Sequence, residues 1–187
     1  MGIVAQLFVA LDGVTESPER WDFPYLDQAM KQSVEHHLLN AELLLLGGAT
    51  YDTFAANWPN RPRDTTLSER IYSMPKVVVT SRSEELMWEN STTLSGELRA
   101  GVLRLADTGP VAIEGSIRLV RALLTLGLID TLQLMIHPIV LGSGRRLFGS
   151  HPDRIAMDLI RIETFPTGVI AARYTPTNRD RATVASH

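Results

Sequence analysis

The chain has 187 residues, of which 44% are hydrophobic and 21% charged, values typical of one globular domain. It contains no cysteine, which excludes disulfides, thiolate metal sites and cysteine nucleophiles and fits a cytoplasmic location. A net charge of −3 argues against a general nucleic-acid surface. No apolar run approaches the ~20 residues of a membrane span, and the first residues lack the basic start of a signal peptide. We therefore expect neither nucleic acid nor a membrane as a partner.

The first two thirds of the chain alternate predicted strands and helices. Apolar and β-branched runs predict buried strands at residues 3–11, 43–46, 76–80 and 111–114. Apolar residues at helical spacing predict helices at 25–39, 50–56, 95–106 and 116–126, with a helical turn at 67–72. Residues 86–93 fit no single element.

The pattern changes in the last third of the chain. Residues 131–137 alternate apolar and polar side chains, and strands at 155–165 and 169–175 flank a Pro-Thr-Gly turn, which predicts a hairpin. We therefore predict an α/β fold with a mixed, mainly parallel sheet, flanking helices and a C-terminal antiparallel hairpin. Residues 1–176 form one predicted domain, and residues 177–187 a polar tail.

The junction around Glu114, Gly115 and Ser116 is the most informative local feature. A buried strand runs there directly into an amphipathic helix, which Ser116 is placed to cap and which Gly127 ends. A glycine lets backbone approach a ligand closely, and the free N–H groups of the first helical turn attract anions such as pyrophosphate. The short motif falls below a dinucleotide signature, and a plain connection is the alternative interpretation.

Two other predicted strands end in residues with the same kind of chemistry. Gly47, Gly48 and Thr50 follow the strand at 43–46, and Thr80, Ser81 and Arg82 stand at the end of the strand at 76–80. Arginine binds phosphate through two N–H groups at once. Ligands of open α/β sheets bind at the carboxyl ends of parallel strands. We therefore expect these three strand ends to face one phosphate-bearing ligand.

Six segments occur in an order that resembles a known family, and together they cover about residues 3–175. They are Phe8–Gly13, Leu46–Tyr51, Pro75–Arg82, Ile113–Ser116, Gly127–Asp130 and Pro138–Gly144. The chain resembles proteins of the dihydrofolate-reductase-like fold, in the branch of the RibD C-terminal domain, the reductase domain of bacterial riboflavin biosynthesis. The resemblance implies an NADPH-dependent reductase.

The resemblance also implies roles for particular residues. Gly47, Thr50, Gly115 and Ser116 take the positions of the family's pyrophosphate turns, and Gly48, between Gly47 and Thr50, is expected to bind the cofactor with them. Thr80, Ser81 and Arg82 match the strand end beside the adenosine 2′-phosphate. A cation at Arg82 is expected to favour NADPH over NADH.

The chain departs from the family at several of these positions. Gly48 stands where the family usually has arginine, and Ser116 where it usually has a second glycine. Phe54 and Asn57 replace acidic residues that serve the riboflavin-pathway substrate. We therefore predict reduction of another small heterocyclic or carbonyl compound. Reduction of 5-amino-6-(5-phosphoribosylamino)uracil is the first alternative. The second is a nucleotide-binding or sensor module without turnover, which Gly48 and Ser116 would favour.

Three acids are candidates for the substrate end of the site. Asp12 follows the first strand, with a turn-forming role as its alternative. Asp27 lies near the start of the first helix, where folate reductases place an acid, and a helix-terminal acid is its alternative. Glu114 matches a substrate-facing family residue, and burial would raise its pKa and suit it to proton donation. Its alternative role is to cap the next helix.

The five histidines show no metal-binding spacing, so we expect no metal. Members of the resembled family often pair through a sheet edge, and we expect a homodimer by analogy.

Overall fold

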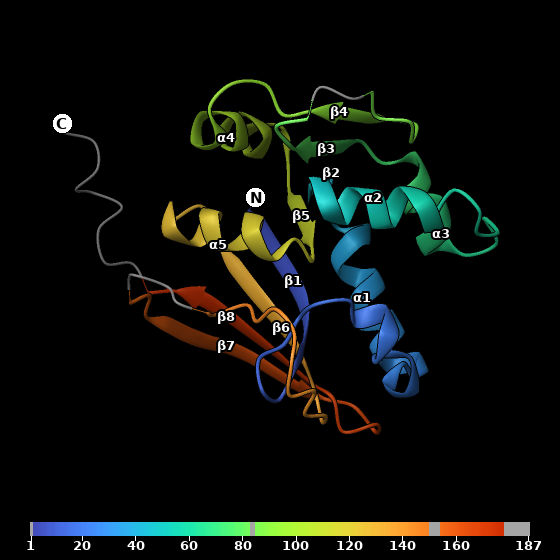
Figure 1. Cartoon of the computed structure of the whole chain (residues 1–187), viewed down its shortest axis with the longest axis vertical. Coiled ribbons are helices and arrows are strands. Elements are labelled where there is room, and N and C mark those ends of the chain that lie inside the picture. The colour runs from blue at the N-terminus through green and yellow to red at the C-terminus, as the bar shows by residue number, and fades with distance from the viewer. Residues whose placement is uncertain (1, 83–84, 150–153, 178–187) are drawn as a thin grey trace.

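A computed structural model describes residues 2–82, 85–149 and 154–177, and within them eight strands form one sheet. The strands are β1 (Ile3–Ala10), β2 (Leu43–Gly47), β3 (Lys76–Val79), β4 (Ser91–Thr93), β5 (Val111–Glu114), β6 (Thr131–His137), β7 (Met157–Thr164) and β8 (Ile170–Pro176). The helices are α1 (Gln28–Leu39), α2 (Gly48–Asn57), α3 (Thr66–Ser73), α4 (Leu98–Thr108) and α5 (Ile117–Thr125), with short 3₁₀ turns η1 (Pro18–Arg20) and η2 (Phe23–Tyr25). Figure 1 shows this arrangement.

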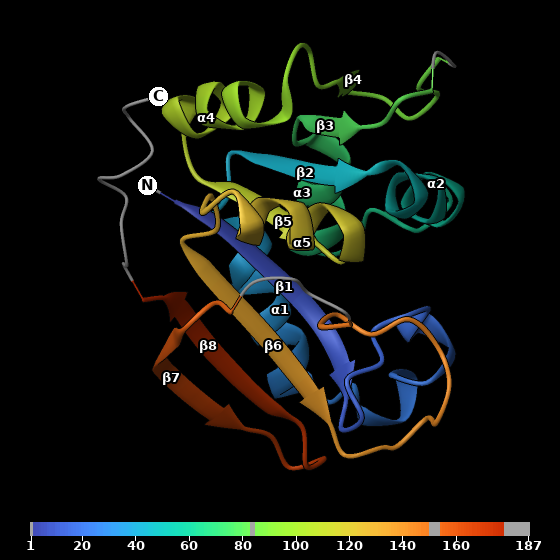
Figure 2. The ribbon, with the colours of Figure 1, turned by 60° about the vertical axis from the view of Figure 1, so that its left-hand side comes forward.

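The strand order is β4-β3-β2-β5-β1-β6-β8-β7. The first six strands in this order, from β4 across to β6, pair in parallel. Strand β8 runs antiparallel to both β6 and β7. Figure 2 shows the β7–β8 hairpin closing one end of the sheet and β4 the other. The predicted mixed, mainly parallel sheet with a C-terminal antiparallel hairpin is therefore confirmed. The predicted tail lies outside the described residues, except for Thr177.

Alternation along the strands divides the core into two layers. On β2, Leu43 and Leu45 pack with α4 and α5, whereas Leu44 and Leu46 pack toward α1 and α3. Buried strands of a parallel sheet are apolar on both faces because helices cover both. The same alternation places Gln6 of β1 on the α1 side, since its neighbours Ala5 and Leu7 face α5.

Several element boundaries differ from the sequence-based predictions. Helix α1 begins at Gln28 rather than Tyr25, because Asp27 caps it and a separate 3₁₀ turn precedes it. Helix α2 begins at Gly48, two residues before the predicted start. Helix α4 begins at Leu98, after its cap Glu97. The unassigned stretch at 86–93 contains β4, which pairs with β3.

The predicted cap at Ser116 is wrong. Ser116 occupies the N-cap position of α5, but its backbone is left-handed, with φ 63°, and its side chain makes no capping hydrogen bond. The hydroxyl instead accepts a hydrogen bond from the Gly47 N–H at 2.9 Å. The predicted end of the helix is correct, since Gly127 follows α5 with a positive φ of 65°.

Candidate functional site

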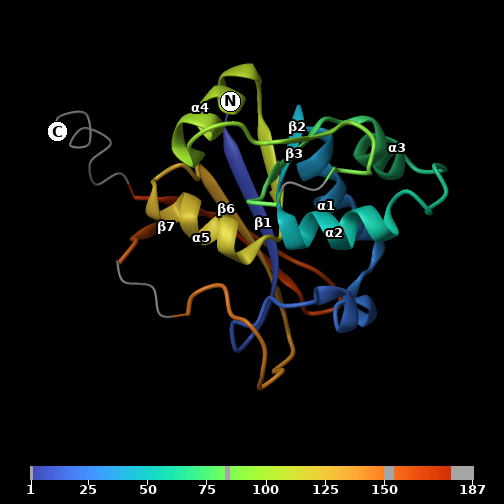
Figure 3. The same ribbon diagram turned by 45° about the horizontal axis from the view of Figure 1, so that its top comes forward.

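The three predicted strand ends line one cavity of about 710 Å³. Its wall contains all eight residues predicted to bind a cofactor: Gly47, Gly48, Thr50, Thr80, Ser81, Arg82, Gly115 and Ser116. Figure 3 shows the first turns of α2 and α5 side by side at the ends of the parallel strands. Both helices therefore direct N–H groups and the positive ends of their dipoles toward this cavity, which suits an anionic ligand.

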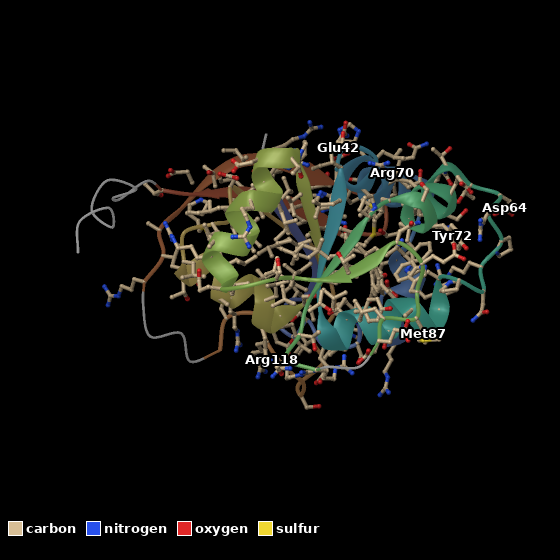
Figure 4. The ribbon with its side chains drawn as sticks, turned by 90° about the horizontal axis from the view of Figure 1, so that it is seen from above. Glu42, Asp64, Arg70, Tyr72, Met87 and Arg118 are labelled. Carbon is tan, nitrogen blue, oxygen red and sulfur yellow. The ribbon has the colours of Figure 1, made fainter. Side chains whose placement is uncertain are left out.

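The hydrogen bond from Gly47 to Ser116 ties the two glycine turns together. The hydroxyl of Ser116 also lies 3.4 Å from the position that a Cβ atom on Gly47 would take. Gly115 has φ 61°, a conformation in which a side chain would be strained. In Figure 4, Arg118 lies near the start of α5, and this residue also lines the cavity.

Arg82 forms an ion pair at the mouth of the cavity. Its Nη2 donates to both carboxylate oxygens of Asp52, at 3.0 and 2.8 Å, and its Nε lies 3.4 Å from the Thr80 hydroxyl. A Cβ atom on Gly48 would lie only 2.9 Å from the same Nη2. The glycine therefore leaves the space in which the Arg82 guanidinium lies.

Part of the cavity wall comes from the loop after β1. Thr15, Glu16, Ser17 and Glu19 line it together with Arg145, whose Nε donates to Glu16 at 2.6 Å. Sequence analysis missed these residues and Asp52. The loop carries no periodic pattern, and the partner of Glu16 lies 129 positions further along the chain. Asp52 could have been predicted as a site residue, because it lies about one turn into the helix that follows the two glycines.

The candidate acids Asp12 and Asp27 do not line this cavity. Asp12 accepts a hydrogen bond from the Gly142 N–H at 2.8 Å and lies 3.6 Å from Arg146, so it anchors the 141–146 segment to the end of β1. Asp27 is the N-cap of α1, and its Oδ1 accepts a hydrogen bond from Met30 at 2.8 Å. The other oxygen of Asp27 is buried without a hydrogen-bond partner in the described structure.

Glu114 lies on the α1 face of the sheet, directly before the glycine turn, and does not line the cavity. It accepts a hydrogen bond from the Gln6 amide at 3.1 Å and lies 3.4 Å from Nε2 of His37. Burial raises the pKa of the Glu114 carboxyl to about 8, although the Gln6 bond opposes the shift. Burial lowers the pKa of His37 to about 4. At neutral pH the contact therefore joins a protonated carboxyl to an uncharged imidazole, which makes it a neutral pair rather than a salt bridge.

The described residues include no group of three or more histidine, aspartate or glutamate side chains arranged to hold a metal ion. No helix in the same ranges is long and apolar enough to span a bilayer.

Comparison with known proteins agrees with the fold. The family model of the RibD C-terminal domain matches residues 2–171. The Bacillus subtilis (strain 168) protein YyaP is 26% identical over 177 residues, which cover 92% of this chain and 93% of YyaP. The chain therefore belongs to the RibD C-terminal domain family, which is a family of reductases.

Solved structures agree at the level of the fold. A putative riboflavin biosynthesis protein from Shewanella sp. PV-4 superposes with a TM-score of 0.75 at 18% identity, covering 95% of this chain and all of that one. A diaminohydroxyphosphoribosylaminopyrimidine deaminase/5-amino-6-(5-phosphoribosylamino)uracil reductase from Thermotoga maritima superposes with a TM-score of 0.64 at 13% identity. That alignment covers 94% of this chain and 56% of the Thermotoga chain.

Proposed function

We propose that the protein is an NADPH-dependent reductase of a small heterocyclic or carbonyl compound. The observation that carries this proposal is the meeting of three strand ends, two helix N-termini and Arg82 in one cavity. Its volume of about 710 Å³ lies within the range of small-molecule sites, roughly 300–1,000 Å³. Membership of a reductase family supports the same class of reaction.

The residues present fit a dinucleotide that carries a 2′-phosphate. The turns at Gly47 and Gly115 leave backbone exposed beside the two helix N-termini, as a pyrophosphate requires. The guanidinium of Arg82, with the hydroxyl groups of Thr80 and Ser81, offers donors for a phosphate dianion. When bound, NADPH would supply the hydride.

The chain's own contribution to such a reaction is binding and orientation. Thr15, Glu16, Ser17 and Glu19 line the cavity together with the strand ends and can restrict the orientation of a bound ligand. Glu114 keeps its proton at neutral pH, but it does not line the cavity, so it is not placed to protonate a ligand there directly.

Phosphorus NMR of NADP⁺ tests this proposal, because the 2′-phosphate and the pyrophosphate give separate resonances. We expect both signals to shift on adding the protein. In the Arg82→Ala variant the 2′-phosphate shift is expected to shrink most. Unchanged signals at millimolar protein would overturn the cofactor assignment.

The riboflavin-pathway reaction is the alternative that the family and the Thermotoga structure favour. NADPH consumption, followed by absorbance, is measured with 5-amino-6-(5-phosphoribosylamino)uracil and with a panel of aldehydes and dihydropterins. Turnover of the uracil compound alone would establish the alternative. NADPH binding without turnover of any compound in the panel would favour the sensor module.

We also propose a homodimer formed through the β7 edge. This strand has no second neighbour in the described sheet, and it exposes Leu159, Ile160 and Ile162, each more than half accessible. An unpaired apolar edge is a ready surface for a second copy related by twofold symmetry. Light scattering of Ile162→Asp against the wild type tests this, with a monomeric variant and a dimeric wild type as the expected result.

A further inference from the structure

A separate cavity of about 400 Å³ lies between α1 and the sheet strands β6, β8 and β7. It shares no lining residue with the reductase cavity. The polar side chains that line it are Gln32, Ser33, His36, Gln133, Arg161, Glu163 and Arg173. A volume of this size holds a small metabolite rather than a single ion.

The charges around this cavity favour an anion. Arg161 and Arg173 contribute two guanidinium groups against one carboxylate, that of Glu163. The pairing between Arg161 and Glu163 is loose, at 3.9 Å, and the Arg161 side chain is 69% exposed. The pair therefore costs little to open, and an incoming oxyanion can take the place of Glu163.

Arg161 and Glu163 belong to β7, the strand proposed for dimerisation, but their side chains lie on the face opposite to that of Ile162. Arg161 pairs with Arg173 on β8, so both side chains lie on the α1 face. Ile162 pairs with Ala172 and belongs to the opposite face. A partner that packs on Ile162 would thus contact the face of β7 opposite to the cavity.

Arg173 is held in place by a ladder of buried side chains. Its Nε and Nη2 donate to Oε1 of Gln133, at 3.0 and 2.6 Å. The Gln133 amide donates to Gln6 at 2.8 Å, and the Gln6 amide donates to Glu114 at 3.1 Å. These hydrogen bonds all run in one direction across four neighbouring strands, so each polarises the next.

The ladder gives the cavity a preorganised cation. The two bonds to Gln133 use two of the five N–H donors of the Arg173 guanidinium and fix the plane of that group at the cavity wall. A donor that is already fixed binds an oxyanion at a smaller entropic cost than a mobile surface arginine. Apolar side chains would pack this part of the sheet equally well, so packing alone does not account for four polar groups in register.

We propose that this cavity binds a small metabolite bearing an oxyanion, either a phosphate or a carboxylate. Arg173 and Arg161 are its cationic contacts, and Gln32, Ser33 and His36 contact the other polar groups of the metabolite. The proposal is independent of the reductase assignment, because it rests on other residues.

Amide-resolved NMR titration with two probes, inorganic phosphate and succinate, tests the proposal. Phosphate is also expected to bind at the pyrophosphate turns, so the titrations use the Arg82→Ala background. In that background we expect millimolar binding of at least one probe, with the largest shifts at Ser33 and Ala171. Binding of phosphate alone assigns a phosphate ligand, and binding of succinate a carboxylate ligand.

Added substitutions locate the site. Arg173→Gln is expected to weaken binding at least tenfold and Arg161→Gln severalfold. Arg104→Gln, which removes an exposed guanidinium on α4, is expected to change nothing. Arg161 is exposed, so its variant keeps the test valid if Arg173→Gln does not fold. Shifts confined to Gly47 and Gly115, or unchanged affinity in both test variants, would overturn the proposal.

Discussion

Arg82 and Asp52 form a two-point ion pair across the mouth of the reductase cavity, with Nη2 of Arg82 at 3.0 and 2.8 Å from the two carboxylate oxygens. The cation proposed to meet the 2′-phosphate is thus already engaged by a carboxylate of the same chain. A bound phosphate dianion must displace Asp52 or tolerate its charge nearby.

Asp52→Asn is therefore expected to strengthen NADPH binding. Exposed ion pairs contribute about 0.2–1 kcal/mol, which corresponds to a Kd lower by a factor of roughly 1.4 to 5. Nicotinamide fluorescence measures the change, and Asp107→Asn on the exposed side of α4 is the charge-matched control. Weaker binding in Asp52→Asn would mean that the carboxylate supports the ligand rather than competing with it.

Gly48→Ala is expected to weaken NADPH binding while leaving the stability of the fold nearly unchanged. The new Cβ atom would lie 2.9 Å from Nη2 of Arg82 and 3.2 Å from the Thr80 hydroxyl, so the guanidinium must move. Alanine suits a helix start, and we expect the free energy of unfolding to stay within about 0.5 kcal/mol of the wild type. NADPH affinity is expected to fall severalfold in fluorescence titrations, while urea denaturation serves as the folding control. Equal affinity would contradict the role given to the glycine.

The pair of Glu114 and His37 predicts an unusual pH dependence of stability. The pKa of Glu114 rises from 4.5 to about 8 on folding, so between these values only the folded chain keeps the proton. Stability therefore falls as the pH rises through that window. The pKa of His37 falls from 6.5 to about 4, and its contribution rises with pH between those values. The two effects oppose each other up to pH 6.5, and above it only Glu114 acts.

Between pH 6.5 and 8 we therefore expect the free energy of unfolding to fall by about 2 kcal/mol. Urea denaturation at the two pH values measures the change in the wild type and in Glu114→Gln. The isosteric amide of Glu114→Gln cannot ionise, so we expect no fall in the free energy of unfolding of this variant over the same pH interval. A parallel decline in both proteins would show that other groups are responsible.

Lys76 is expected to be a stability determinant, although it is charged. It is fully buried, and its Nζ donates to the carbonyl groups of Tyr72 and Met74 at 2.9 Å and of Glu89 at 3.2 Å. Lys76→Met would leave these carbonyls unpaired and lower the free energy of unfolding by roughly 2–4 kcal/mol. Lys31→Met on the exposed side of α1 is the matched control for urea denaturation. A loss below 1 kcal/mol in Lys76→Met would indicate that water replaces the ammonium.

Sequence patterns predicted the strand ends well because their signals are local. A buried apolar run followed directly by Gly47 or Gly115 carries the strand, the turn and the helix start within a few residues. The parallel order of the strands then brings these ends together without further information. The hydroxyl of Ser116 was misassigned, because its partner Gly47 is 69 positions away and no local pattern records that pairing.

The polar ladder could not be predicted for the same reason. Gln6, Gln133 and Arg173 sit singly in apolar strands, and only the register of β1, β6 and β8 places them side by side. The place of residues 15–19 in the cavity wall could likewise not be predicted from the sequence, since it depends on the pairing of Glu16 with Arg145.

The most direct test of the proposed function is a titration of the purified protein with NADPH and NADH, followed by nicotinamide fluorescence, in the wild type and in Arg82→Ala. We expect micromolar NADPH binding that is at least tenfold tighter than NADH binding, and loss of most of that preference in Arg82→Ala. Absence of binding by either nucleotide, or an equal preference in both proteins, would contradict the assignment of this cavity to NADPH.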